Sequence, residues 1–395
     1  MNLSSLRSRP FKRILLIKPS ALGDVIHALP VLVKLRARYP SARIDWLLTP
    51  PLAELVRHHP ALSAPVLFAR QEWGDLRRGR SAAAGLWGMV RALRRARYEL
   101  VVDLHGQFRS ALFCLASGAP ARVGFDRPGP AARANPRGLP AEAFRHAWTG
   151  AREGAWLAYT HRIPVPTLDA HAVDRYLWLG KLLALDESPP DFRIPLPGGA
   201  EARAAALLEE GGVAGRPFAV LVPGTVWETK HWRVDGFAAV ARHLHATGRG
   251  VVLAGSAKER DRCRAVADAC PAACDLSGRT TVPELAALLR RAAVCVTNDS
   301  GSMHLAVALG RPVVAVFGPT DPLWVGPYGQ PHAVVRSGVP CSPCYLRSLR
   351  RCRHGHVCMG EVSAAEVIER VEEAVAGAFP AAVSVSGQGV LPIAA

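Results

Sequence analysis

The chain lacks any apolar run of the ~18 to 20 residues that a membrane-spanning helix needs. Its basic start, MNLSSLRSRPFKR, leads into a short strand-like segment and not into the apolar core of a signal peptide. We therefore expect a cytoplasmic protein. The nine cysteines are an odd number, which is compatible with reduced thiols in that compartment.

Acidic residues are scarce relative to basic ones, since 32 Asp and Glu stand against 49 Lys and Arg and give a formal net charge of +17. This charge favours an anionic partner: nucleic acid, an anionic membrane surface or an acidic substrate. A nucleic-acid-binding protein would need aromatic residues interleaved with its basic surface, or a reading helix, and the sequence offers neither. We therefore expect no nucleic-acid partner.

The length and composition indicate two packed domains. A chain of 395 residues exceeds what one hydrophobic core usually serves, and roughly 150 to 200 residues per domain is the natural division. Hydrophobic residues make up 49% and charged residues 21%, which is ordinary globular composition. The sequence contains no internal repeat of short period.

The first domain is predicted over residues 1–185. The run RILLIK is followed by a helix-like segment and then by RIDWLL, which is the pattern of a βαβ unit. Pro30 falls inside the helix-like segment and predicts a kink or a restart. Residues 118–150 are rich in Gly, Pro and Ala and predict a long surface loop. Residues 170–185 predict a helix, and the Pro-rich stretch 186–200 a linker.

The second domain is predicted over residues 201–361, where strand-like runs such as PFAVLVPG, GVVLAG and AVCVTND alternate with helices. This alternation predicts a parallel sheet covered on both faces, so the fold class is α/β with two Rossmann-like halves. Residues 362–378 predict a helix whose Ser363 and Glu366 have capping-box spacing. We expect this helix to cross back to the first domain, and residues 379–395 to form a flexible tail.

Polar turns follow two strands of the second domain, where ligands of parallel sheets bind. After AVCVTN come Asp299, Ser300 and Gly301, at the start of a helix whose first N–H groups can face an anion. A helix cap without a ligand explains the same string. After AVLVPG come Thr225 and Lys230, and a lysine there can neutralise a phosphate or simply be exposed. Because both polar turns are expected at the same edge of the sheet, together they favour a diphosphate-binding site.

The first strand-helix junction, ILLIKPSALGDVIHALP, carries a carboxylate, Asp24. A phosphate site at this junction would use glycines and backbone N–H groups, and a carboxylate would repel the anion. Asp24 is also a favoured residue type for a helix N-terminus. The residues alone leave its role open.

Three motifs resemble those of glycosyltransferase family 9, the ADP-heptose:lipopolysaccharide heptosyltransferases: IKPSALGDVIHALP, PGTVWETKHWRVDGFAAVARHL and TNDSGSMHLAVALGRPVVAVFGPTDPLWVGPYG. The resemblance runs from about residue 13 to residue 377. It implies a GT-B fold, in which two Rossmann-like, doubly wound domains face each other across a cleft. ELVVDLHGQFRSA, AREGAWLAYTHR and AHAVDRYLWL most resemble the heptosyltransferase I group, which adds the first heptose to the Kdo sugar of the inner core.

The resemblance also implies roles for individual residues. Asp24 would be the general base of an inverting transfer, kept ionised by the helix N-terminus and nearby arginines. Lys230 would stabilise the departing ADP, with no metal and no cofactor besides the donor ADP-heptose. The implied donor-binding residues are Thr225, Glu259, Arg279, Asp299, Ser300, Gly301 and His304. The implied acceptor-binding residues are Arg70, Arg109 and Arg152.

The same resemblance implies the setting. The acceptor would be an anionic glycolipid, Kdo-bearing lipid A, and the protein would lie peripherally on the cytoplasmic face of the inner membrane. Family 9 enzymes of the heptosyltransferase II or III type, with another core acceptor or donor sugar, are the alternative within the enzyme class. Outside that class the alternative is a catalytically silent nucleotide-sugar-binding protein.

The sequence departs from the family pattern at two places. Val226 follows Thr225 where paired threonines are frequent, so one hydroxyl contact with the donor is missing. The second is the cysteine-bearing segment CSPCYLRSLRRCRHGHVC, which supplies Cys341, Cys344, Cys352 and Cys358. A CxxC pair with two more thiols fits a zinc site, a reduced structural loop or redox pairing.

Overall fold

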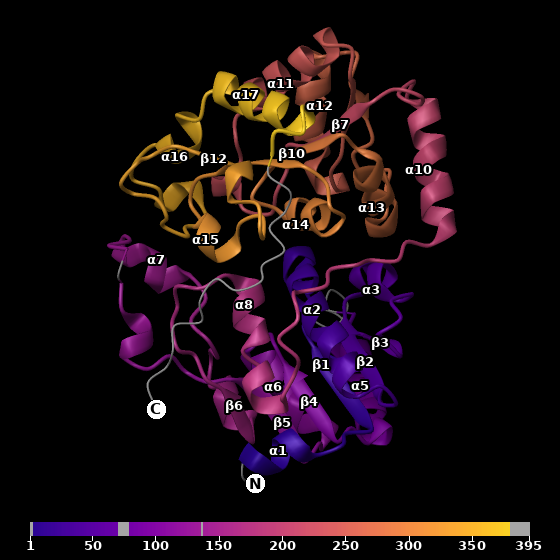
Figure 1. Cartoon of the computed structure of the whole chain (residues 1–395), viewed down its shortest axis with the longest axis vertical. Helices are drawn as coiled ribbons and strands as arrows, with labels where there is room; N and C mark the ends of the chain where they lie inside the picture. The colour runs from indigo at the N-terminus through magenta and orange to yellow at the C-terminus, as the bar shows by residue number, and fades with distance from the viewer. Residues whose placement is uncertain (1–2, 70–78, 136, 380–395) are drawn as a thin grey trace. The chain divides into compact units, whose positions relative to one another are not determined.

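The computed structural model describes residues 3–69, 79–135 and 137–379, and the chain divides into two compact units (Figure 1). The first unit holds residues 1–186 and 194–197, and the second holds residues 187–193 and 198–395. The chain therefore passes from one unit to the other within the stretch predicted as a linker. Each unit has its own six-stranded parallel sheet, as the alternating pattern predicts.

The sheet of the first unit has the strand order β3-β2-β1-β4-β5-β6. The strands are β1 (Arg13–Ile17), β2 (Arg43–Leu48), β3 (Ala64–Leu67), β4 (Leu100–Asp103), β5 (Ala121–Phe125) and β6 (His161–Ile163). In the centre, Ile14 of β1 pairs with Ile44 of β2 on one side and with Leu100 of β4 on the other. These strands are buried on both faces, which explains their continuous apolar sequences.

The helices of the first unit include one unbroken element where a kink was expected. They are α1 (Leu3–Ser8), α2 (Leu22–Arg38), α3 (Pro50–Val56), α5 (Gly79–Ala96), α6 (Phe108–Ser117), α7 (Ala141–His146), α8 (Ala172–Leu177) and α9 (Gly180–Leu183), with short 3₁₀ turns at Ala131–Arg133 and Ala155–Ala158. Pro30 is buried within α2, which continues past it to Arg38, so the predicted restart is wrong. The single helix predicted over 170–185 is two short helices, α8 and α9.

The loop predicted over residues 118–150 contains β5 and α7, so that prediction is also wrong. Gly124 obscures β5 in the sequence, but the structure requires glycine there: a Cβ would lie 2.4 Å from the Tyr159 ring. Tyr159 in turn donates a hydrogen bond of 2.8 Å to Asp103 at the end of β4. Burial and the charge of Asp103 raise the pKa of Tyr159, which stays neutral.

The sheet of the second unit has the order β12-β11-β10-β7-β8-β9. Its strands are β7 (Phe218–Val222), β8 (Gly250–Leu253), β9 (Cys274–Asp275), β10 (Val294–Asn298), β11 (Val313–Phe317) and β12 (Val334–Arg336). Its helices are α10 (Gly198–Glu210), α11 (Val234–Ala246), α12 (Arg260–Ala269), α13 (Val282–Arg291), α14 (Gly301–Ala308), α15 (Pro322–Val325), α16 (Val357–Gly360) and α17 (Ala364–Val375). Short 3₁₀ turns are Glu228–Lys230, Ala257–Glu259, Pro331–Ala333 and Leu349–Arg351.

Both sheets share one topology, in which the strand order reverses next to the first strand of the unit. The reversal lies between β1 and β4 in the first unit and between β7 and β10 in the second. Loops leave such a point toward opposite faces of the sheet and open a crevice at the carboxyl ends of the strands. The fold therefore provides one candidate binding position in each unit.

Helix α17 begins with the capping box that the sequence predicts. The Ser363 hydroxyl accepts a hydrogen bond of 3.2 Å from the Glu366 N–H, and Glu366 accepts one of 2.9 Å from the Ser363 N–H. The buried Val367 and Val371 join the core of the second unit beside α11 and β11. The expected crossing of this helix to the first domain stays a prediction, and the tail predicted over 379–395 lies outside the described residues from 380 onward.

Replacing Ser363 with alanine is expected to destabilise the second unit by about 1 kcal/mol, because the cap would be lost. Its thermal transition should fall by about 2 to 4 °C in calorimetry. Ser363→Asp is the matched control, since aspartate can cap in the same way and should leave the transition near that of the wild type. Equal transitions for the alanine and aspartate variants would contradict a stabilising role for this cap.

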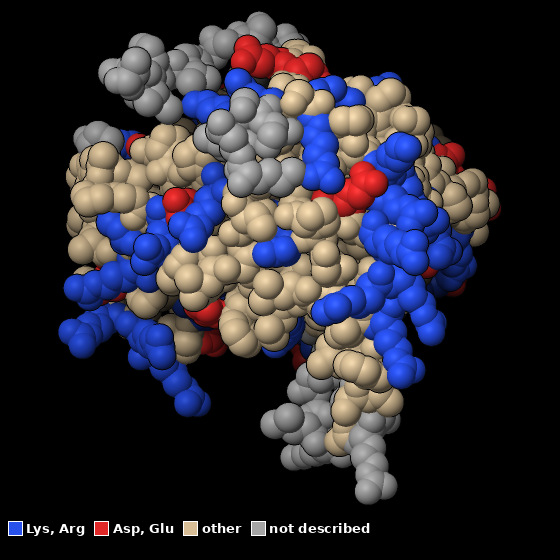
Figure 2. All heavy atoms as spheres, turned by 90° about the horizontal axis from the view of Figure 1, so that it is seen from below, with Lys and Arg blue, Asp and Glu red and all other residues tan. Residues whose placement is uncertain are grey.

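None of the helices in the described part of the chain combines the length and the apolar character that a bilayer span requires. On the face seen in Figure 2, Lys and Arg side chains form several groups, and Asp and Glu are few. The basic excess of the sequence is therefore visible as surface charge.

Candidate active site

In the second unit, an ion pair joins the two polar turns at the switch point. Lys230, in the turn after β7, places its Nζ 2.5 Å from Oδ2 of Asp299, which follows β10. Their side chains are only 13% and 5% exposed. The Thr320 hydroxyl donates a hydrogen bond of 2.6 Å to the same Oδ2. A buried carboxylate is tolerated here because a cation balances its charge and a hydroxyl donates a hydrogen bond to it.

Asn298, which the sequence analysis missed, fixes these two turns against each other. Its side-chain amide donates 2.8 Å to the Pro223 carbonyl, and its side-chain oxygen accepts 2.9 Å from the Trp232 N–H. Thr225 also connects the turns, since its hydroxyl donates 3.3 Å to the Asp299 carbonyl. The convergence of Thr225, Lys230 and Asp299 on one sheet edge, predicted because both turns follow strands of a parallel sheet, is therefore confirmed.

Helix α14 begins at Gly301, directly beside this ion pair. Ser300 caps the helix: its hydroxyl accepts 3.4 Å from the Met303 N–H and lies 2.9 Å from the Thr297 hydroxyl. His304, one turn further on, is 7% exposed. The cap that the sequence offered as an alternative is present, and the remaining N–H groups of the first turn can still face an anion.

The two predicted nucleoside residues have different surroundings. Glu259 accepts 2.7 Å from the Ser256 N–H and packs over Gly224, where a Cβ would lie 2.5 Å from the Glu259 Cγ. Glu259 therefore lies against the turn that follows β7. Arg279 instead makes two hydrogen bonds of 2.7 Å to the carboxylate of Glu210, on the exposed end of α10. No contact joins Arg279 to the Lys230–Asp299 pair among the described residues.

In the first unit, Asp24 lies in the first turn of α2 at the switch point and is held by three groups. Its Oδ2 accepts 3.0 Å from the Ala21 N–H. Its Oδ1 lies 3.1 Å from Lys18 Nζ and accepts 3.0 Å from the Tyr176 hydroxyl. Lys18 is 7% exposed, whereas Asp24 is 40% exposed and keeps one side toward solvent. Asp24 is therefore anchored and still reachable.

The charge state of Asp24 follows from these neighbours. Burial alone would raise its pKa, but the Lys18 charge and the Ala21 N–H outweigh burial and hold the pKa below its usual value. Burial would likewise lower the pKa of Lys18, but Asp24 raises it. Burial and the Asp24 charge raise the pKa of Tyr176, which remains a neutral donor. A lysine and a tyrosine thus hold Asp24 ionised, where arginines were predicted to do so.

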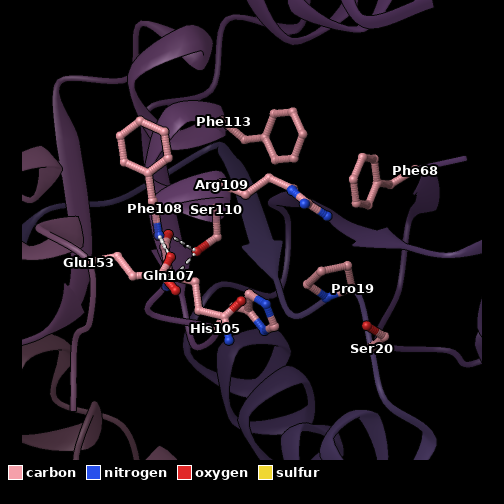
Figure 3. Close-up of a pocket in the computed structure, with 10 residues that line it drawn as sticks. All are labelled: Pro19, Ser20, Phe68, His105, Gln107, Phe108, Arg109, Ser110, Phe113 and Glu153. Carbon is pink, nitrogen blue, oxygen red and sulfur yellow. Dashed lines mark hydrogen bonds between the residues drawn. The ribbon is translucent and has the colours of Figure 1, made fainter. Parts of the chain in front are cut away.

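A pocket lies at the same switch point, between the loops after β1 and β4 (Figure 3). Its lining residues are Pro19, Ser20, Phe68, His105, Gln107, Phe108, Arg109, Ser110, Phe113 and Glu153. In Figure 3, Arg109 extends from α6 across the pocket toward Pro19 and Phe68. Pro19 and Ser20 belong to the loop that leads to Asp24. Arg109 offers this pocket one cation for an anionic group and its aromatic walls suit a ring, while Glu153 adds one carboxylate to the lining.

Of the other two predicted acceptor arginines, the structure describes Arg152 but not Arg70. Arg152 donates a hydrogen bond through its guanidinium to the Ala147 carbonyl, and its N–H bonds the Gly106 carbonyl at 2.8 Å. Its neighbour Glu153 accepts 3.2 Å from the Phe108 N–H and lines the pocket. Arg152 therefore fastens the 147–153 segment to the pocket rim. Arg70 lies outside the described residues.

The sequence model of glycosyltransferase family 9 (heptosyltransferase) matches residues 86–135 and 136–351. The chain belongs to this family. A relative, lipopolysaccharide heptosyltransferase 1 of Pseudomonas aeruginosa, is 31% identical over 342 residues, or 85% of this chain and 87% of the relative. This family 9 member is accordingly a glycosyltransferase.

Solved structures of the family show the same fold. The family 9 glycosyltransferase of Veillonella parvula superposes with a TM-score of 0.73 at 21% identity, over 93% of this chain and 98% of that one. The structure described as E. coli heptosyltransferase WaaC with ADP gives 0.68 at 24% identity, over 92% and 99%. The two sheets of this family 9 chain thus form a GT-B fold.

The cysteine-bearing segment of this family 9 chain contacts the turn that carries Lys230. The Thr229 hydroxyl donates 2.6 Å to the Leu346 carbonyl, and His356 Nε2 lies 2.6 Å from the Thr229 carbonyl. Arg347 stacks 4.6 Å from the Trp227 ring centroid, and Lys230 Nζ lies 4.3 Å from the same centroid. The segment therefore braces the turn that carries Lys230, and no motif in the sequence indicated this contact.

All four cysteines of the segment are free thiols, and burial raises the pKa of Cys358 to about 12. Over residues 3–69, 79–135 and 137–379, no group of three or more His, Cys, Asp or Glu side chains is arranged to hold a metal ion. Outside this segment, Val226, which stands where paired threonines are frequent in the family, is 92% exposed. The contacts of the segment agree with the structural-loop alternative.

Proposed function

We propose that the protein transfers heptose from ADP-L-glycero-D-manno-heptose to the Kdo sugar of the lipopolysaccharide inner core, with inversion at the anomeric carbon. The observation that carries this proposal is the Asp24 carboxylate at the switch point of the first sheet. The charge of Lys18 keeps it ionised, and its side chain is still 40% exposed. The name of the Pseudomonas relative supports the acceptor class, and the WaaC structure with ADP supports the donor class.

Asp24 acts as the general base in this mechanism. The acceptor hydroxyl attacks the anomeric carbon of the heptose, its proton passes to Asp24, and the bond from that carbon to the diphosphate breaks with its electron pair leaving on ADP. A carboxylate with a low pKa is a weak base, but an oxocarbenium-like transition state requires proton removal only late. Lys18 and Tyr176 orient the carboxylate and keep it ready to accept.

Lys230 stabilises the charge that grows on the departing ADP. An ammonium has three N–H donors, so Lys230 can keep its contact with Asp299 and still bind a diphosphate oxygen. The N–H groups at the start of α14, beside Ser300, add donors for the same charge. Thr225, in the turn after β7, and His304, in α14, complete the donor site, and the proposal requires no metal.

The acceptor side is anionic and amphiphilic, as befits a Kdo-bearing lipid A. Arg109 in the pocket matches a carboxylate through forked hydrogen bonds, and the aromatic walls match a sugar ring. The net charge of +17 favours approach to an anionic surface. We propose that the enzyme works peripherally at the cytoplasmic face of the inner membrane.

A panel of acceptors tests this assignment. With ADP-heptose as donor, transfer to Kdo-bearing lipid A is expected to exceed transfer to a core that already carries heptose. The reverse preference would assign the protein to the heptosyltransferase II or III type. Saturable ADP-heptose binding without transfer to any acceptor would identify a silent nucleotide-sugar-binding protein and contradict the proposal.

Lys18→Met is expected to move the acid limb of the pH profile of kcat to higher pH. Asp24 must be ionised to act, so activity falls as the pH drops through its pKa. In the wild type Lys18 holds that pKa low; without Lys18, burial dominates and raises it. Lys12→Met, at an exposed lysine near the same strand, is the control. Superimposable profiles for both variants would contradict the role of Lys18.

A further inference from the structure

Large apolar side chains are exposed in one region of the first unit. Of ten such residues that are exposed in the described chain, seven belong to this unit: Leu67, Leu86, Trp87, Phe108, Leu112, Leu115 and Leu157. Six of the seven come from α5, α6 and the Ala155–Ala158 turn. Exposed apolar residues scattered singly need no explanation, but a cluster on adjoining elements indicates an interaction surface.

Helix α6 carries the centre of this surface. Phe108, Leu112 and Leu115 follow one another at helical spacing and are 55%, 46% and 48% exposed. The opposite side of α6 is satisfied, because Phe113 and Cys114 are buried in the unit. A helix that is apolar on its inner side and also on its outer side has more apolar surface than the fold uses.

The neighbouring elements extend the surface of α6. Helix α5 packs beside α6, where Arg94 donates 2.9 Å to the Ala116 carbonyl, and contributes Leu86 and Trp87, which is 58% exposed. The Ala155–Ala158 turn also packs on α6 and contributes Leu157, which is 76% exposed. We call the six residues Leu86, Trp87, Phe108, Leu112, Leu115 and Leu157 the α5–α6 face.

Basic residues outnumber acidic ones around this face, where Glu153, which accepts a hydrogen bond from the Phe108 N–H, is an acid at the margin. Helices α5 and α6 contain no Asp or Glu, whereas exposed Arg91 and Arg95 lie on α5. Arg91 stacks on Trp87 at 5.4 Å from the ring centroid. In the Ala155–Ala158 turn, Trp156 carries Arg127, whose guanidinium lies 4.7 Å from the ring centroid. Apolar side chains with tryptophan at a basic margin match the interface of an anionic lipid bilayer.

We propose that the α5–α6 face is the surface by which this protein docks on an anionic lipid membrane. The face continues into the pocket of the first unit, since Phe108 and Arg109 both line it and Figure 3 shows the Phe108 ring at the edge away from Pro19 and Ser20. Docking would therefore hold the pocket at the depth of the lipid headgroups. This inference deepens the proposed function and rests on it for the identity of the lipid-linked acceptor.

Cosedimentation with vesicles, in the absence of donor and acceptor, tests the docking directly. The full chain is expected to bind phosphatidylcholine vesicles that contain phosphatidylglycerol, to bind pure phosphatidylcholine much less, and to lose binding as salt rises. The double variant Leu112→Ser with Leu115→Ser should have a water-to-vesicle partition coefficient lower by about tenfold or more, since both positions lose their apolar contact with lipid. Arg91→Glu with Arg95→Glu should remove the preference for anionic vesicles.

Matched variants of the second unit provide the controls. Leu323→Ser with Leu349→Ser removes two leucines that are 50% and 40% exposed, and Arg203→Glu with Arg264→Glu inverts two exposed arginines. Both double variants should bind vesicles as the wild type does. Equal loss in the α6 and control variants, or no binding of the wild type to anionic vesicles, would overturn the proposal. So would a leucine variant that abolishes self-association in analytical ultracentrifugation but still binds vesicles.

Transfer to a water-soluble Kdo acceptor without a lipid chain separates this inference from the proposed function. The Leu112/Leu115 variant should retain turnover on that acceptor and lose it on acceptor embedded in vesicles. If turnover on the embedded acceptor also persists, the docking proposal fails while the proposed function stands. If the wild type docks on vesicles but transfers heptose to neither acceptor, the proposed function fails while the docking proposal stands.

Discussion

Replacing Asp24 with alanine is expected to lower kcat by about 10² or more while leaving the KM for ADP-heptose nearly unchanged. The loss corresponds to about 2.7 kcal/mol or more of transition-state stabilisation. Donor affinity should persist because the residues proposed to bind the donor belong to the second unit, whereas Asp24 belongs to the first. Steady-state release of ADP, with acceptor present, measures both constants.

Two further variants make the Asp24 result specific. Asp24→Asn keeps a group of similar shape that can still accept from the Ala21 N–H, so a comparable loss of kcat would assign the effect to the carboxylate charge. Glu142→Ala removes an exposed acid of the same unit and should change neither constant. Near-normal turnover in both Asp24 variants would exclude it as the base.

Replacing Lys230 with methionine is expected to lower kcat/KM by about 10³, because the charge on the departing ADP loses its nearest cation. The same change leaves the Asp299 carboxylate buried without its cation, at a cost of about 3 to 5 kcal/mol in stability. Activity alone would therefore confuse catalysis with folding. The measurement pairs transfer kinetics with thermal unfolding of each variant.

A double variant separates the two effects of Lys230. Lys230→Met with Asp299→Asn removes the unpaired charge and keeps an acceptor for the Thr320 hydroxyl, so stability should largely return. Activity should stay low, because no cation faces the diphosphate. Recovery of activity together with stability would show that Lys230 serves only to balance Asp299.

Much of the fold could be predicted because its central strands have continuous apolar sequences. β1, β7 and β10 are buried on both faces, and such strands read as Val, Ile and Leu runs. β5 was missed because Arg122 and Gly124 interrupt it, and its need for Gly124 comes from a tyrosine 35 residues away in the chain. Tertiary packing of that kind leaves no local pattern.

In the candidate site, too, the residues set by local patterns were predictable and those set by tertiary packing were not. Thr225, Lys230 and Asp299 were predictable because two polar turns follow neighbouring strands, and strand order brings them to one edge. The partners of Asp24 were not predictable, since Lys18 directly follows an apolar strand and Tyr176 lies 152 positions away. The Glu210 partner of Arg279 was equally hidden, because a surface ion pair between distant helices and loops has no sequence signature.

Pro30 shows a different limit of prediction from sequence, which concerns whether a helix continues past a proline. Proline within a helical pattern normally predicts a break, because it removes one hydrogen bond and crowds the preceding turn. In α2 that cost is borne within an apolar environment that includes the fully buried Val31 and Leu32, and the helix continues. Burial of the whole segment outweighs a local preference, which the sequence pattern alone could not weigh.

The stereochemistry of the transfer product tests the central claim most directly. The enzyme would be incubated with ADP-heptose of known anomeric configuration and Kdo-bearing lipid A, and the new glycosidic linkage would be assigned by NMR. We predict one heptose attached to Kdo with the configuration inverted at its anomeric carbon. Retained configuration, or release of free heptose without transfer, would contradict a single displacement assisted by Asp24.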